Sequence, residues 1–81
     1  MKLPRDLSGR ELAGRLRREL GYLVVHQVGS HMILERPSDP HHRIAVPDHR
    51  ALRVGTLNGI LRAVADAHGL GKEQVARRLF R

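Results

Sequence analysis

The sequence predicts an α+β domain in which two or three helices cover one face of a three-stranded antiparallel sheet, in the order α-β-β-β-α-α. Three observations predict it: helical periodicity near the N-terminus, three short runs of strand-forming residues, and helical periodicity again near the C-terminus. The turns between the runs are too short for crossovers, so the strands are expected to be antiparallel. With 81 residues the chain suits a single domain over residues 1–81, and one sheet face is expected to stay open.

The first helix is predicted to begin after Ser8, because Ser8 and Glu11 have the spacing of a capping box. Gly21 suits the left-handed residue that commonly ends a helix. Between them, leucines recur every four residues and form one apolar stripe through Leu12, Leu16 and Leu20.

Residues 22–28, 31–36 and 43–46 are the predicted strands. Gly29-Ser30 is a two-residue turn of the glycine-first type, which would pair Val28 with His31 and Val25 with Leu34. Side chains alternate along a strand. We therefore expect one set to face the helices: Leu23, Val25, Met32 and Leu34. The open face is expected to hold Tyr22, Val24, His26, Val28, His31 and Ile33, with His26 and His31 as diagonal neighbours.

A loop from Asp48 to Val54 carries Arg50 and Arg53, and a second helix is predicted from about Gly55 or Thr56 to Gly69. Gly55 and Thr56 are expected to cap this helix, with phosphate binding at its N-terminus as a second role. A short last helix is predicted over residues 72–79.

The chain is strongly basic, with 15 Lys and Arg against 8 Asp and Glu and a net charge of +7. This balance predicts a polyanionic partner, either a nucleic acid or an acidic protein that mimics one; the alternative is a merely solubilising surface. Tyr22 and Phe80 are too few aromatic residues for a base-stacking platform, so contacts to phosphates are expected. The sequence has no membrane-spanning run and no signal-peptide core, which predicts a cytoplasmic protein without membrane contact.

Six histidines raise the question of zinc, which usually needs three or four fixed ligands. The sequence has no cysteine and no His-x₃-His pair. We expect no metal site and no cofactor, although His26, His31 and His49 are a set that could converge.

Five segments, taken in order, resemble the HicA family, the toxin half of toxin–antitoxin pairs. Each is weak alone, but their order and spacing are specific: residues 8–12 (SGREL), 20–25 (LGYLVV), 29–34 (GSHMIL), 46–49 (VPDH) and 55–62 (GTLNGILR). The resemblance implies a fold like the double-stranded-RNA-binding domain and a metal-independent mRNA interferase that is inhibited by a HicB-type antitoxin. It assigns the catalytic histidine to His31.

One departure from the family pattern concerns the residues before the Gly-Ser-His motif. Basic residues are usual there, whereas this chain has His26-Gln27-Val28. Phosphate contacts are therefore expected elsewhere, first from Arg50 and Arg53.

RNA can be cleaved without a metal because its own 2′-hydroxyl can attack the adjacent phosphorus. The enzyme must take a proton from that hydroxyl, deliver one to the leaving 5′-oxygen and stabilise charge on the phosphate. We hypothesise that His31 is the general base or acid, while arginines and the backbone amides of Gly29-Ser30 hold the phosphate. His49 and His26 are candidates to assist, each against the alternative of a spectator role.

Two other functions remain open from the sequence. One is a non-catalytic module that binds double-stranded RNA, and the other is a decayed toxin that only binds its antitoxin. The assembly also remains open between a homodimer and a toxin–antitoxin hetero-oligomer.

Overall fold

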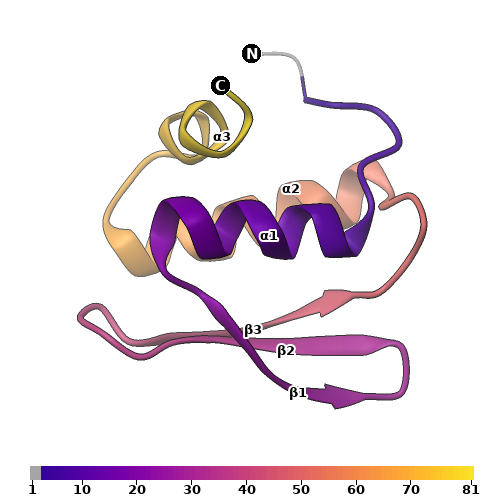
Figure 1. Ribbon diagram of the computed structural model, residues 1–81. Helices are drawn as coiled ribbons and strands as arrows, with labels where there is room; N and C mark the ends of the chain where they lie inside the picture. The colour runs from indigo at the N-terminus through magenta and orange to yellow at the C-terminus, as the bar shows by residue number, and fades with distance from the viewer. Residues whose placement is uncertain (1–2) are drawn as a thin grey trace.

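A computed structural model describes residues 3–81 of the protein. The chain runs through the elements in the predicted order (Figure 1): α1 (Gly9–Leu20), β1 (Leu23–Val28), β2 (His31–Arg36), β3 (His42–Pro47), α2 (Val54–His68) and α3 (Lys72–Phe80). The strands form a three-stranded antiparallel sheet in the order β1-β2-β3. No helix within residues 3–81 is long and apolar enough to cross a membrane.

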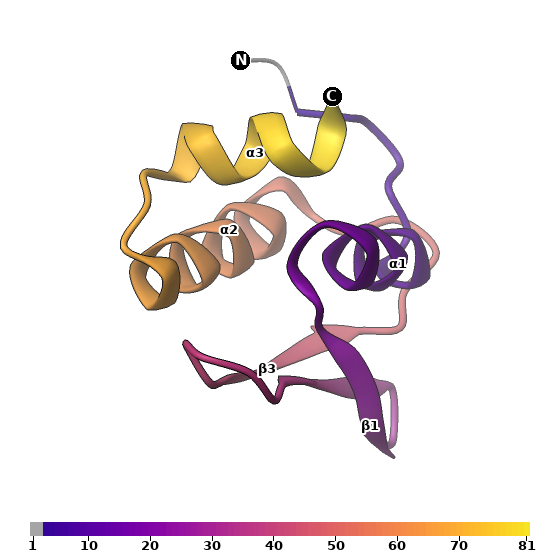
Figure 2. The ribbon, with the colours of Figure 1, turned by 60° about the vertical axis from the view of Figure 1, so that its left-hand side comes forward.

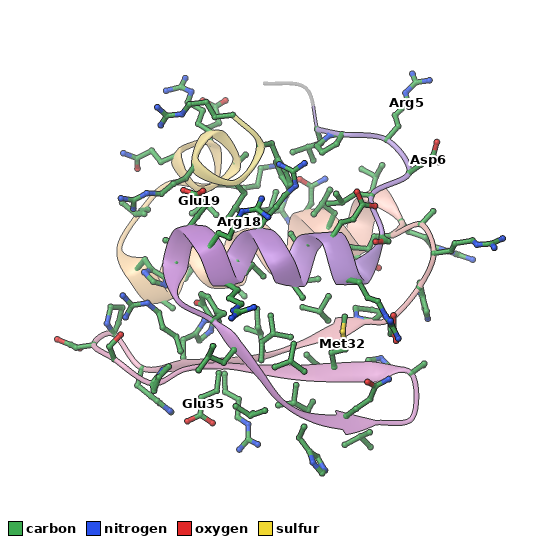
Figure 3. The ribbon with its side chains drawn as sticks, viewed as in Figure 1. Arg5, Asp6, Arg18, Glu19, Met32 and Glu35 are labelled. Atoms are coloured by element: carbon green, nitrogen blue, oxygen red, sulfur yellow. The ribbon has the colours of Figure 1, made fainter. Side chains whose placement is uncertain are left out.

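The helices lie on one side of the sheet, in two layers. Figures 1 and 2 show α1 and α2 next to the sheet and α3 on the far side of those two helices. Within the described residues the opposite sheet face is uncovered. Figure 3 shows the two directions on β2, where Met32 points toward α1 and Glu35 points away from the helices. The predicted α+β layout with one open sheet face is confirmed.

The N-terminus of α1 has the predicted capping box. The Ser8 hydroxyl accepts a hydrogen bond from the Glu11 amide at 3.0 Å, and the Glu11 carboxylate accepts one from the Ser8 amide at 3.1 Å. Gly21 ends the helix with a φ of 75°, where a residue with a Cβ would be strained. The predicted leucine stripe is buried in the core against the sheet and the other helices.

Gly9 is where α1 meets the end of β3. The Gly9 amide donates to the carbonyl oxygen of His49 at 2.9 Å, and a Cβ on Gly9 would overlap the carbonyl oxygen of Pro47. One step further along the loop, the Leu52 amide donates to the Leu7 carbonyl at 2.7 Å. Backbone contact this close requires glycine, so the first turn of α1 fixes the path of the chain from β3 to α2.

The β1–β2 register follows the prediction only near the turn. His26 pairs with Ile33 as expected, but Val24 then pairs with Leu34, which leaves Val25 as the extra residue of a β-bulge. An extra residue reverses the faces of all residues before it. The expected faces of residues 22–25 are therefore wrong: Leu23 and Val25 are 44% and 48% exposed, Tyr22 is fully buried, and Val24 shares the helix-side face with Leu34.

The bulge turns Tyr22 into the core, where its hydroxyl has two histidine partners. The hydroxyl oxygen lies 2.7 Å from Nδ1 of His42 and 3.0 Å from Nε2 of His68. These bonds satisfy a polar atom that would otherwise be costly to bury, and they join the starts of β1 and β3 to the end of α2. Burial raises the pKa of Tyr22 and lowers the pKa of both histidines.

The start of α2 also differs from the prediction. The helix begins at Val54, and Arg53 occupies the N-cap position without a capping hydrogen bond from its side chain. Gly55 and Thr56 therefore lie inside the first turn and do not cap the helix, because the chain is already held in place one turn earlier through Leu52.

Replacing Gly9 by alanine is expected to destabilise the protein by about 2 kcal/mol or more, because the new methyl group overlaps the Pro47 carbonyl. Gly59→Ala is the matched control: Gly59 lies inside α2 with open space around it, and alanine there should add up to about 1 kcal/mol. Urea denaturation of both variants measures the difference. Equal stabilities would show that the close approach at Gly9 is not a constraint.

The Tyr22 cluster is expected to make stability depend on pH. In the unfolded chain both histidines titrate near their ordinary pKa of about 6.5, whereas burial lowers their pKa in the folded state. The unfolded state therefore takes up protons first, so stability is complete above about pH 6.5 and falls as the pH drops below it. The carboxylates with lowered pKa, Glu11, Glu35 and Asp48, contribute their own loss only at more acidic pH.

Thermal melting at pH 7.5 and pH 5.5 tests this expectation. The wild type should melt at a lower temperature at pH 5.5, and the double variant His42→Gln/His68→Gln should show a smaller difference. His26→Gln, which changes an exposed histidine of β1 away from this cluster, should behave as the wild type does. A pH effect of equal size in the wild type and the double variant would contradict the assignment.

Candidate functional site

His31 is the first residue of the middle strand, and it is exposed on the open face. It pairs with Val28 on one side and with Pro47 on the other. Its neighbour Met32 is buried toward the helices, so the imidazole of His31 belongs to the opposite face. A histidine fixed by strands on both sides is held in position while its ring stays open to a large ligand.

His26 lies on the same face. It pairs with Ile33, two residues along β2 from His31, so the two histidines are diagonal neighbours as predicted. Diagonal neighbours on one sheet face are about 7–8 Å apart, within reach of a common ligand. Both side chains are exposed.

Two hydrogen bonds hold the turn between the strands. Gly29 has a φ of 58°, as a glycine-first turn requires. The Ser30 carbonyl accepts a hydrogen bond from the Asp48 amide at 2.6 Å, and the Gln27 side-chain amide donates to the Gly29 carbonyl at 3.3 Å. The turn beside His31 is thereby attached to the segment that follows β3.

Asp48 connects this turn to α1. Its carboxylate accepts two hydrogen bonds from the Arg10 guanidinium, Nε to Oδ1 at 3.1 Å and Nη2 to Oδ2 at 3.2 Å, and a third from Gln27 at 3.4 Å. The hydrogen bond from Arg10 lowers the pKa of Asp48 and raises the pKa of Arg10. Asp48 is thus a carboxylate at neutral pH, and its negative charge is matched by a guanidinium.

The sequence alone does not single out Arg10, Gln27 or Asp48 as functional residues. A signal was present, since Arg10 and Asp48 lie in two of the five segments that carry the resemblance to the HicA family. Their pairing across 38 positions could not be seen without the fold.

The remaining residues that the sequence predicts for the site lie on the loop from β3 to α2 and at the start of α2. His49 follows directly after Asp48 and is exposed, as is Arg50. Arg53 lies further along, at a cavity of about 590 Å³ that it shares with Leu3 and Pro4 near the N-terminus. His31, His26, Gly29 and Ser30 therefore lie together at the hairpin end of the sheet, and His49 follows Asp48, whose amide is bonded to Ser30. Arg53 and the exposed Thr56 stand apart from them, at the start of α2.

The histidines could also serve as metal ligands. Within residues 3–81 no group of three or more His, Asp or Glu side chains has an arrangement that could hold a metal ion. His26, His31 and His49 therefore do not form a metal-binding set.

Fold and site define a small basic α+β domain whose middle strand presents a histidine beside a glycine turn, on an uncovered sheet face. The family described as HicA toxin of bacterial toxin–antitoxin systems matches residues 9–65. This match covers most of the chain, including α1, the whole sheet and His31, and the chain therefore belongs to the HicA toxin family. No match was found among curated proteins or among solved structures. The resemblance seen in the sequence is confirmed, and the protein is a toxin of a toxin–antitoxin system.

Replacing Asp48 by asparagine is expected to loosen the hairpin turn, because Arg10 loses its carboxylate partner and Gln27 one of its acceptors. Amide hydrogen exchange followed by NMR should become faster in residues 26–32. Glu35→Gln is the control, since Glu35 pairs with His41 and Arg43 at the other end of the same hairpin. Unchanged exchange at the turn, or equal acceleration there in both variants, would rule out this role for Asp48.

Proposed function

We propose that this toxin is an endoribonuclease that cleaves mRNA without a metal ion, with His31 as its catalytic residue. The observation that carries the proposal is the position of His31: exposed, on the middle strand, and beside a turn that is tied to Asp48. A flat open sheet face admits a polymer, which a closed pocket would not.

The reaction needs two proton transfers. The 2′-hydroxyl oxygen forms a bond to phosphorus while its proton leaves to a base, and the bond from phosphorus to the 5′-oxygen breaks as that oxygen receives a proton. The products are a 2′,3′-cyclic phosphate and a 5′-hydroxyl. Imidazole suits either transfer because its ordinary pKa lies near neutrality.

Charge on the phosphate is neutralised by exposed arginines and by the backbone at Gly29-Ser30. Arg10 is already paired with Asp48. Arg50 follows His49 directly and is the nearest candidate along the loop, whereas Arg53 and Thr56 suit phosphates further along the RNA. These loop residues would take the place of the basic residues that are usual in the family before the Gly-Ser-His motif and that β1 lacks.

The second proton transfer falls to His26 or His49. His26 shares the sheet face of His31 through the strand register, and His49 follows the strand that flanks His31 on the other side. A bell-shaped pH profile of cleavage reports the acid and the base together. The assisting histidine is the one whose replacement by alanine removes one limb of that profile.

The partners follow from the same assignment. A toxin that acts on mRNA works in the cytoplasm, and a HicB-type antitoxin binds it and blocks its activity. The net charge of +7 favours binding of both RNA and an acidic protein.

Replacing His31 by alanine is expected to reduce RNA cleavage by about 100-fold or more, because general acid–base catalysis contributes at least that much. The assay uses end-labelled RNA in excess EDTA, and the melting temperature should not change because His31 is exposed. His41→Ala is the control: His41 is exposed at the far end of the β2–β3 hairpin and should leave cleavage unchanged.

Full cleavage by the His31 variant would overturn the assignment of the catalytic residue, and loss of wild-type cleavage in EDTA would overturn metal independence. RNA binding without cleavage by the wild type would identify a non-catalytic binding module. Binding of antitoxin alone would identify a decayed toxin.

A further inference from the structure

β1 is an edge strand with an unusual surface. All six of its residues are exposed, and none of them is Asp, Glu, Lys, Arg or Pro. Four carry large apolar side chains, with exposures of 44% to 58%: Leu23, Val24, Val25 and Val28. Edge strands usually carry charges or proline, which prevent other strands from pairing with their free backbone groups. A β-bulge can also protect an edge, and the bulge at Val25 is the only protective feature within β1. The rest of the edge is open to a further strand.

A cavity of about 280 Å³ lies beside this edge, between α1 and β1. Arg10 and Arg17 contribute to it from α1, and Val24 and Gln27 from β1. Four further residues complete its lining, Ala13, Gly14, Tyr22 and Met32. A strand added to β1 would direct every second side chain toward the helix side. One of these would reach the cavity, which offers apolar surface next to two guanidinium groups.

The positive net charge of the molecule indicates which kind of strand could pair with β1. A second copy would carry another net charge of +7, and this overall repulsion opposes pairing of two β1 edges. RNA offers no backbone amides to pair with a strand edge and no apolar side chain for the cavity. An acidic polypeptide satisfies three features: the free edge, the apolar cavity and the guanidinium of Arg17, since Arg10 is already paired with Asp48.

We propose that the β1 edge is the docking surface for the antitoxin, which adds an acidic extended strand to the sheet and places an apolar side chain between Arg10 and Arg17. The identity of this partner rests on the toxin–antitoxin assignment. His26 lies on β1, so the added acidic strand would run beside the open face near His31. The negative charge of that strand would repel RNA phosphates from this face.

Two arginines of α1 provide a matched test. Arg17 and Arg18 both lie in the last turn of the helix and both are exposed, so reversing either charge has the same cost at the helix end. Arg17 lines the cavity, whereas Arg18 lies on the side of α1 away from the sheet (Figure 3). The probe is a purified HicB-type antitoxin that forms a complex with the wild type, titrated by calorimetry against the toxin and each variant.

Arg17→Glu is expected to weaken antitoxin binding about tenfold or more, whereas Arg18→Glu should remain within about threefold of the wild type. Both variants should cleave RNA as the wild type does. In the wild-type complex, amide exchange should slow down in residues 23–28, because the edge of β1 becomes paired.

Several results would overturn the proposal. Equal weakening by the two charge reversals would show a general charge effect, and unchanged exchange in residues 23–28 would exclude strand addition. Loss of RNA cleavage by Arg17→Glu would assign the cavity to RNA. Protection of β1 in the concentrated toxin alone would assign the edge to a second copy. If the wild type forms no complex with any HicB-type antitoxin, the proposed docking is refuted. The cleavage assays would still decide whether the protein is a ribonuclease.

Discussion

The contact between the first turn of α1 and the end of β3 is the constraint on which the site depends. At Gly9 the two backbones are too close for a Cβ, and one residue later Arg10 holds the Asp48 carboxylate with two hydrogen bonds. Asp48 in turn binds the carbonyl of Ser30 through its amide. Three segments distant in sequence are thereby joined at one end of the molecule, and His31 stands beside that junction.

Several residues in the segments that resemble the HicA family are explained by this structural junction and not by a part in catalysis. Gly9, Arg10 and Asp48 occur in segments that resemble the HicA family, yet none of them is proposed to move a proton. Their contacts hold the turn before His31 in place, and a catalytic group needs such positioning to meet a phosphate in a reactive geometry. The two half-buried histidines on the Tyr22 hydroxyl have a comparable structural role at the opposite end of the sheet.

The bulge at Val25 separates two functions of β1. On the turn side of the bulge the strand keeps the regular register that sets His26 beside His31 on the open face. On the other side it turns Tyr22 into the core and leaves Leu23 and Val25 exposed. One extra residue thus gives a short strand both a proposed catalytic face and an exposed apolar edge, which we propose as the docking surface.

The sequence by itself determined the order of elements, the ends of α1, the two-residue turn and the open face of His31, because these depend on contacts between near neighbours. It also determined the family, through segments whose order and spacing are specific. The faces of residues 22–25 and the start of α2 could not be read from it, since a bulge has no local signature here and the path of the loop is fixed by Leu7 and Gly9. Only the tertiary structure paired Arg10 with Asp48 and Tyr22 with His42 and His68, because those pairs span 20 to 46 positions and exist only once the layers have packed.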